Sequence, residues 1–348
     1  MTCGRGAAML WLLFLVALLL ILGTSLLGLS RTELTVSAHL LNAARAQYAA
    51  EAGVELAVAY LGQSFIDLGE EGWLYEHAHD PAFAVQAEKK DNRTLLITSV
   101  GYAGNLAQKV EVPATYRPLG RQVLVAGKLA AGELSAEGHV TARKVFFASG
   151  ISSIDGDLRA ERVETAAGAT YTVSGHLCPD WLQQSAAVDF SALRQRAEVE
   201  NWEEPPLSAG GEYIMTGPAA GPLFAPDDAV IDLQETADCF LVADGDITVA
   251  GVAPGSRVAA LAAGDVILPP VSVWEGSLFL YAAGDMLRSG EEMLYFAGCL
   301  VAGEMEINKL HVRYCDEAVW AYLEILPKEL FRLGATFDLE WADPEPRR

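Results

Sequence analysis

The chain has 348 residues with 24 basic and 46 acidic side chains, so its formal net charge is −22, yet 51% of its residues are hydrophobic. That combination excludes a disordered acidic chain, because such chains lack the apolar residues needed to build a core. Residues 1–62 carry three basic and three acidic side chains, so the whole net charge lies in residues 63–348. A body this acidic repels phosphate backbones, which argues against nucleic acid as a ligand.

The first expected element is a membrane-spanning helix over residues 7–29. This segment has no charged residue, and about 20 apolar residues at a rise of 1.5 Å cross a hydrocarbon core. Residues 30–62 contain no proline and are rich in alanine, with Leu34, Leu41 and Tyr48 at seven-residue spacing. We therefore expect residues 30–62 to form a helical stalk that continues the span as one helix of about 55 residues.

Two strings in this region carry a resemblance to a known family. They are GRGAAML at Gly4–Leu10 and QYAAEAGVE at Gln47–Glu55. Together with the apolar run between them, they resemble the N-terminal domain of PilX-like type IV pilus assembly proteins, of the minor pilin and pseudopilin class. The resemblance is confined to about residues 4–61.

The resemblance implies a leader over residues 1–6 that a prepilin peptidase removes between Gly6 and Ala7. It also implies a single-pass protein of the cell membrane with a cytoplasmic N-terminus, an extracytoplasmic head and other pilin-like subunits as partners. The residues that it implies for packing between helices are Ala49, Ala50, Glu51, Ala52 and Gly53.

One position departs from the pattern of major pilins. If cleavage follows Gly6, the fifth mature residue is Trp11, where major pilins carry a glutamate that pairs with the N-terminal amine of the neighbouring subunit. The departure favours a tip, priming or low-abundance role over incorporation along a long filament. An ordinary single-span anchor with a helical stalk is the alternative.

Residues 63–118 predict a loop followed by a small antiparallel sheet. Alternating apolar and polar residues over 83–88, 94–102 and 108–116 indicate three strands. In the loop, His77 and His79 alternate as metal ligands on a strand would, but a solvated loop is the favoured interpretation.

An internal repeat dominates residues 227–312 and predicts a β-solenoid. Glycines with acidic neighbours recur at intervals of 19, 20 and 19 residues, a period typical of coils that stack on one another. These glycines are Gly245, Gly264, Gly284 and Gly303. A weaker echo over residues 119–175 predicts a first solenoid stretch, and residues 176–226 predict an excursion that contains a helix.

Apolar residues at helical spacing in residues 313–348 predict a C-terminal cap that shields the edge of the last coil. The expected fold class is therefore α+β. It consists of a long N-terminal membrane-spanning helix that continues into a stalk, a small antiparallel sheet and a β-solenoid head.

Four acids next to the repeat glycines are the one constellation that resembles a site: Asp246, Asp265, Asp285 and Glu304. Stacked at about 4.8 Å per coil, they could hold Ca²⁺ or cleave a glycan. We favour a solubility role in which the acids point into water, because each has the same environment whereas catalysis needs two different ones. The nearest basic residues in the sequence are Arg288 and Lys309.

Other signatures of chemistry are missing from the sequence. No GxSxG string, Walker loop or GxGxxG fingerprint occurs, so we expect no catalytic residues, no cofactor and no enzyme activity. The five cysteines form no CxxC pair and read as small buried hydrophobes, although Cys299 and Cys315 could form a disulfide outside the cytoplasm. They are Cys3, Cys178, Cys239, Cys299 and Cys315.

The sequence thus predicts a non-catalytic, membrane-anchored minor pilin or pseudopilin-like component of a type IV pilus or related assembly, with an acidic head displayed outside the cell. The alternative is a membrane-anchored β-helix protein that binds or cleaves a surface carbohydrate. A third hypothesis is a scaffold that polymerises through its coils, as bactofilins do; the acidic corners and the terminal helix argue against it.

Overall fold

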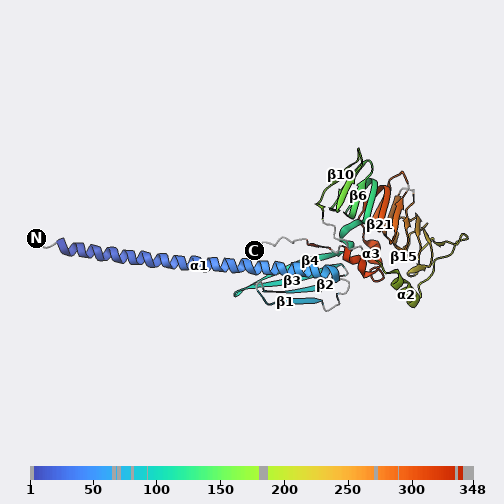
Figure 1. The fold of residues 1–348 in the computed structure, drawn as a ribbon. Helices are drawn as coiled ribbons and strands as arrows, with labels where there is room; N and C mark the ends of the chain where they lie inside the picture. The colour runs from blue at the N-terminus through green and yellow to red at the C-terminus, as the bar shows by residue number, and fades with distance from the viewer. Residues whose placement is uncertain are drawn as a thin grey trace. The chain divides into compact units, whose positions relative to one another are not determined.

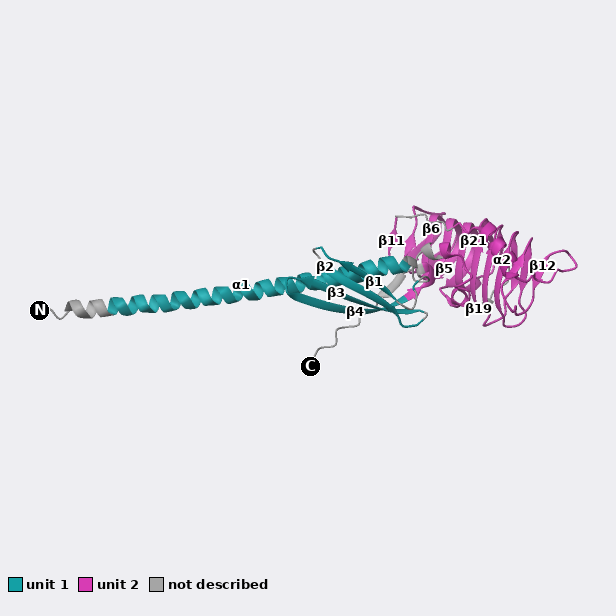
Figure 2. Ribbon diagram, turned by 90° about the horizontal axis from the view of Figure 1, so that it is seen from below, with its two compact units in different colours: residues 1–115, 339–348 teal, residues 116–338 magenta. Residues whose placement is uncertain are grey.

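The computed structural model describes residues 4–64, 68, 72–79, 82–91, 93–179, 187–269, 273–288, 290–333 and 336–339. Figure 1 shows the fold, and Figure 2 colours the two compact units of the chain separately. Unit 1 comprises residues 1–115 and 339–348, and unit 2 comprises residues 116–338.

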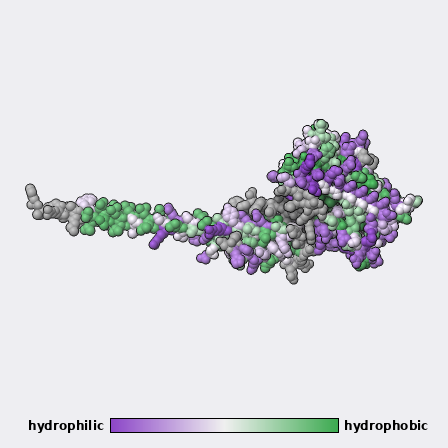
Figure 3. Space-filling model, viewed as in Figure 1, coloured by the Kyte–Doolittle hydropathy of each residue, from purple (hydrophilic) through white to green (hydrophobic). Residues whose placement is uncertain are grey.

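A single continuous helix, α1 (Gly4–Ser64), runs through 61 residues and confirms the prediction that the apolar segment and the stalk form one element. Its segment Trp11–Gly62 is long and apolar enough to cross a membrane by length and composition, with a mean hydropathy of 2.7 in its most apolar stretch. None of that stretch is buried, and Figure 3 shows hydrophobic residues gathered there. The hydroxyls of Thr24 and Thr32 donate to carbonyls four residues earlier, so these polar groups are satisfied within the helix.

The predicted small sheet has the strand order β1-β2-β3-β4-β22, with antiparallel pairing from β1 to β4. The strands are β1 (Trp73–His77), β2 (Ala82–Lys89), β3 (Thr94–Ala103), β4 (Leu106–Arg117) and β22 (Thr336–Leu339). The three predicted strands correspond to β2, β3 and β4.

Strand β1 corrects the prediction of a loop around His77. It pairs with β2 from Trp73 opposite Ala87 to His77 opposite Phe83. Aromatic rings stabilise it, because Trp73 stacks on Tyr60 of α1 at a centroid distance of 5.1 Å and His77 stacks on Phe83 at 5.4 Å. Aromatic residues at alternate positions were therefore the strand signal.

Unit 2 is a β-solenoid of seventeen strands in the described residues, which confirms the prediction from the 19- to 20-residue repeat. Its strands are β5 (Gln122–Glu137), β6 (His139–Phe147), β7 (Ile151–Asp155), β8 (Leu158–Arg159), β9 (Arg162–Thr165), β10 (Thr170–Val173), β11 (Leu177–Cys178), β12 (Tyr213–Met215), β13 (Leu223–Ala225), β14 (Ala229–Asp232), β15 (Asp238–Ala243), β16 (Ile247–Gly251), β17 (Arg257–Ala262), β18 (Val266–Ile267), β19 (Val273–Ala282), β20 (Asp285–Arg288) and β21 (Leu294–Arg313). Each coil pairs in parallel with the next, and aliphatic side chains fill the interior.

The order of the coils in space differs from their order in the chain. The last strand of the repeat, β21, pairs in parallel with the first, β5, from Leu300 opposite Leu124 to Arg313 opposite Glu137. From this joint, β6 to β11 build the stack in one direction, and β20 back to β12 build it in the other. The first and last strands of the solenoid along the chain therefore meet in the middle of the stack. Figure 1 shows β10, β6, β21 and β15 following one another across the stack.

The excursion between the two stretches runs along the side of the coils. It contains α2 (Phe190–Glu200), where a helix was predicted, with Asp189 as its N-cap. The N–H of Val188 donates to the hydroxyl of Tyr281 at 3.2 Å, and Trp202 contacts Phe240 edge-on at 5.7 Å. These contacts lie two coils apart, on β19 and β15 with β17 between them, so this part of the chain follows the solenoid across its coils.

The C-terminal region differs from the expected cap. The second edge of the last coil is not free, because β5 pairs with it. The short helix α3 (Glu317–Ala321) lies against β17 and β19, where the N–H of Ala318 donates to Ser277 Oγ at 3.0 Å. Two 3₁₀ helices, η2 (Pro118–Arg121) and η3 (Lys328–Leu333), contact each other, and β22 belongs to the small sheet.

Candidate functional site

One corner of eight successive coils carries a charged residue, and these residues stack into a line that we name the corner column. Its register follows from the strand pairs, for example Asp285 opposite Glu304 and Ile247 opposite Val266. In stacking order the column consists of Asp228, Asp246, Asp265, Asp285, Glu304, Lys128, Lys144 and Arg162. The four predicted acids therefore do come together at one corner.

The acids of the corner column hold neighbouring coils together. Asp228 Oδ1 accepts the N–H of Asp246 at 2.8 Å, Asp246 Oδ1 accepts that of Asp265 at 2.7 Å, and Asp265 Oδ1 accepts that of Asp285 at 2.7 Å. We call this series the aspartate ladder. It revises the prediction that the acids point into water, because a corner N–H needs an acceptor and the preceding carboxylate supplies it.

The aspartate ladder also explains the repeat glycines. A Cβ on Gly264 would overlap Asp246 Oδ1, and a Cβ on Gly284 would overlap Asp265 Oδ1. Glycine and aspartate therefore recur as a pair, because the glycine leaves room for the carboxylate of the preceding coil. Among the described residues, no three His, Cys, Asp or Glu side chains are grouped as ligands of a metal ion would be.

The corner column changes sign at the joint between β21 and β5. Lys128 Nζ lies 3.0 Å from Glu304 Oε2, and this hydrogen bond raises the pKa of Lys128. Lys144 and Arg162 continue the column on the next two coils. Sequence reasoning missed these three residues, because Lys128 lies 176 residues before Glu304 and becomes its neighbour only through the joint.

Arg288, one of the two basic residues nearest the acids in the sequence, lies instead in the interior. Only 4% of it is exposed, and its guanidinium donates to the carbonyl oxygens of Pro269 at 3.2 Å, Lys309 at 2.6 Å and Glu292 at 2.6 Å. Burial lowers the pKa of Arg288. Arg288 thus holds backbone from several coils and is not available to an outside ligand.

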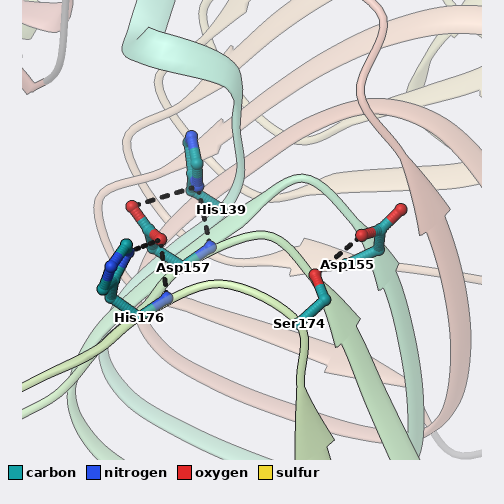
Figure 4. Close-up of polar contacts among 5 residues, drawn as sticks. All are labelled: His139, Asp155, Asp157, Ser174 and His176. Atoms are coloured by element: carbon teal, nitrogen blue, oxygen red, sulfur yellow. Dashed lines mark hydrogen bonds and ion pairs between the residues drawn. The ribbon is translucent and has the colours of Figure 1, made fainter.

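A second polar cluster, shown in Figure 4, lies at another corner of the first stretch. His139 Nδ1 accepts the N–H of Asp157 at 2.9 Å, and Asp157 Oδ1 accepts the N–H of His176 at 2.9 Å. The backbone N–H of His176 is the main cause that lowers the pKa of Asp157. The signal for this cluster was present as glycine followed by His or Asp at three corners, 18 and 19 residues apart.

The second cluster is also a series of side chains that accept backbone N–H groups from the next coil. Ser174 Oγ donates to Asp155 Oδ1 at 2.7 Å, so the hydroxyl is bonded to a carboxylate and not to an imidazole that could act as its base. The imidazole ring of His176 is largely exposed, whereas the imidazole ring of His139 and the carboxylate of Asp157 are mostly covered. The two side chains that are mostly covered, His139 and Asp157, accept backbone N–H groups as the aspartate ladder does.

The predicted helix-packing residues lie where α1 contacts the small sheet. Ala49 and Ala50 are fully buried, and a Cβ on Gly53 would lie 2.8 Å from Phe83 Cδ2. Glu51 and Ala52 are half-buried. These small residues let helix and sheet approach closely, and packing between subunits stays a prediction.

Three further groups of residues that the sequence singles out lie on α1 and in the C-terminal part of the chain. Gly6 and Ala7 lie in α1, and cleavage between them stays a prediction. The thiols of Cys299 and Cys315 are free, and Cys299 is buried, which raises its pKa. On the stalk, the apolar residues at seven-residue spacing are exposed, at 70% for Leu34, 53% for Leu41 and 70% for Tyr48.

No protein-family model matches the chain, and no curated protein matches it. Among solved structures, the competence-associated pilin ComZ from Thermus thermophilus is similar to this chain with a TM-score of 0.33 and 12% sequence identity. The match covers 78% of this chain and 92% of that chain.

Proposed function

We propose that the protein is a non-catalytic, membrane-anchored, pilin-like subunit of the PilX-like minor pilin or pseudopilin class, which displays an acidic solenoid head outside the cell. The observation that carries the proposal is α1, one uninterrupted helix of 61 residues. Its first part exposes apolar side chains throughout, and its last part packs its small residues on an antiparallel sheet.

Three further features support the proposal. The strings at Gly4–Leu10 and Gln47–Glu55 resemble those of PilX-like proteins. The exposed stripe of Leu34, Leu41 and Tyr48 offers an apolar surface for a neighbouring helix beyond the membrane span. The polar groups at the coil corners bind the protein's own backbone, which accounts for their recurrence without catalysis.

Processing of the N-terminus tests this proposal most directly. The full chain, extracted from membranes of cells with an active prepilin peptidase, is expected to begin at Ala7. The variant Gly6→Leu should keep Met1, whereas Gly23→Leu, at a glycine whose surroundings are open, should be processed normally. Recovery of Met1 from the unaltered chain in such cells would refute the assignment.

The partners can be tested separately through the exposed stripe. We expect the full chain to co-purify with other pilin-like subunits, and Leu41→Asp to reduce that recovery because a charge would enter a helix contact. His39→Asp, which introduces the same charge at an exposed position on the opposite side of the helix, is the control. Equal recovery with Leu41→Asp would exclude the stripe as the contact.

A further inference from the structure

The sheet that carries the corner column has an outward face with a second, partly apolar line of residues. We name it the joint face, formed by β18, β20, Glu304–Ile307 of β21, Lys128–Ala131 of β5, Lys144–Phe147 of β6 and β9. Two residues after each of the six charged residues from Asp265 to Arg162 in the stacking order, the strand presents another outward side chain. This second line consists of Ile267, Leu287, Glu306, Ala130, Phe146 and Glu164.

Three large hydrophobic side chains of the joint face are exposed to solvent. The exposed fractions are 41% for Ile267, 37% for Leu287 and 38% for Phe146. Leu287 and Phe146 lie on opposite sides of the joint, each one coil away from it. The apolar surface is therefore distributed on both halves of the face.

The charge of the joint face is divided between its halves. Residues 203–313 hold seventeen acidic and four basic side chains, whereas residues 119–178 hold six of each. On the face itself, Asp265, Asp285 and Glu304 lie on one side of the joint, and Lys128, Lys144 and Arg162 on the other. One half of the face is thus acidic. The other half carries three basic residues and one acid, Glu164, which pairs with Arg162, and each half also exposes apolar side chains.

We propose that the joint face binds the joint face of a second copy of this chain. A two-fold axis parallel to the strands, at the level between Glu304 and Lys128, reverses the stacking order and brings the acidic half of one copy onto the basic half of the other. Lys144 then faces Asp285 of the second copy, Arg162 faces its Asp265, and Phe146 faces its Leu287. An axis along the stack would place acid on acid, so charge complementarity selects the reversed arrangement.

The interface between the two joint faces is small, but anchoring of both copies in one membrane would favour its formation. Six strands at about 4.8 Å give a face of roughly 29 Å across the coils, which corresponds to a weak interface in solution. Two copies held in the same membrane would meet at a much higher effective concentration. The pairing follows from unit 2 alone and does not depend on the proposed pilin function.

Charge reversal in the full chain tests the proposal, with association measured by sedimentation in detergent at low and high salt. Lys144→Glu and Asp285→Lys should each weaken self-association by about tenfold or more, because each creates two like-charge contacts per dimer. Asp285 is suited to this change because, among the described hydrogen bonds, the aspartate ladder ends at its N–H.

A mixture of the two variants gives the sharper outcome. Combined one to one, Lys144→Glu and Asp285→Lys restore both contacts and should form a heterodimer, although neither variant pairs with itself. Arg313→Glu and Glu235→Lys, exposed charge reversals away from the joint face, should neither weaken association nor show preference when mixed. A wild-type chain that stays monomeric, or a dimer that the reversals leave unchanged, would overturn the proposal.

Cross-linking in membranes gives a second readout. With Cys178 and Cys315 replaced by serine, a mixture of Phe146→Cys and Leu287→Cys chains should form a disulfide between copies. Phe146→Cys alone should not, since its two copies would lie about three coils, or ~14 Å, apart. A disulfide in the single variant, or none in the mixture, would contradict the reversed arrangement.

Discussion

At the residue scale, the corners of the coils show how a backbone N–H determines the choice of side chain. Where a strand ends, its N–H has no strand carbonyl opposite, and the carboxylate of the preceding coil accepts the bond. The acceptor is aspartate in the second stretch and both aspartate and histidine in the first. The corner N–H therefore requires a hydrogen-bond acceptor, and an acidic side chain is one of the residue types that supply it.

Substitution of Asp265 separates the acceptor from the charge. Asp265→Asn keeps an oxygen acceptor and removes one of several stacked negative charges, so stability should stay within about 0.5 kcal/mol of the parent. Asp265→Ala leaves the N–H of Asp285 without its acceptor and should cost about 1–3 kcal/mol. Denaturant unfolding of the two variants checks this, and equal losses for both would show that charge is what matters.

Acid should weaken the second cluster through Asp157. The backbone N–H of His176 holds the pKa of this carboxyl below its ordinary value of 3.8. Because the folded-state pKa is lowered, the stabilisation is fully present above the unfolded pKa and is lost as pH falls through the folded one. The melting temperature of Asp157→Asn should lie below that of the parent at pH 6 and converge with it towards pH 3.

The control for this pH dependence is Glu235→Gln, a charge-removing change at an exposed site on another corner. It should run parallel to the parent at every pH. A gap between parent and Asp157→Asn that stays constant from pH 6 to pH 3 would exclude ionisation of Asp157 as its cause.

At the element scale, the contact between α1 and β3 depends on small residues on both sides. Ala46, Ala49 and Ala50 are fully buried, and β3 presents Gly101 to them. A Cβ on Gly101 would overlap the carbonyl oxygen of Ala46 and the backbone nitrogen of Ala50. The alanine-rich string is therefore required within unit 1, whatever further contacts the helix makes.

Gly101→Ala should loosen this contact, because the clash is with backbone that cannot rotate away. We expect a loss of about 1–3 kcal/mol, seen as faster amide hydrogen exchange in β2 and β3 but not in the solenoid. Gly217→Ala, where a Cβ meets open space, is the matched control. Unchanged exchange in β3 would show that the helix shifts at no cost.

Helices and strands could be predicted because each follows from a local sequence pattern. The order of the coils in space could not be predicted, because it depends on pairing between residues far apart in the sequence. The length of α1 follows from an apolar run and a proline-free stalk, and the coils follow from a 19- to 20-residue period. The aromatic alternation that makes β1 does not by itself predict a strand, because five residues give a weak signal. Lys128 could not be assigned to the corner column, because no local feature marks it as the partner of Glu304.

At the scale of the whole molecule, the joint places the first and last strands of the solenoid inside the stack instead of at its two ends. A solenoid built in chain order has its first and last coils at its two ends, where fraying begins. Here the first and last strands, β5 and β21, meet in the middle over pairs such as Leu310 opposite Leu134. The coils at which the repeat begins and ends along the chain therefore have a neighbouring coil on both sides. The outermost coils of the stack come from the interior of the sequence.

Two leucine truncations distinguish this arrangement from an ordinary stack. Leu310 in β21 and Leu158 in β8 are both fully buried, so replacement by alanine should cost about 2–5 kcal/mol in each case. Leu310→Ala removes packing at the joint and should speed hydrogen exchange on both sides of it, in β6 and in β19. Leu158→Ala lies towards one outer end and should affect β7 to β11 while leaving β15 and β17 protected. If Leu310→Ala altered exchange in β19 alone, the two stretches would be independent folding units, and the joint would be a contact between them instead of the centre of one solenoid.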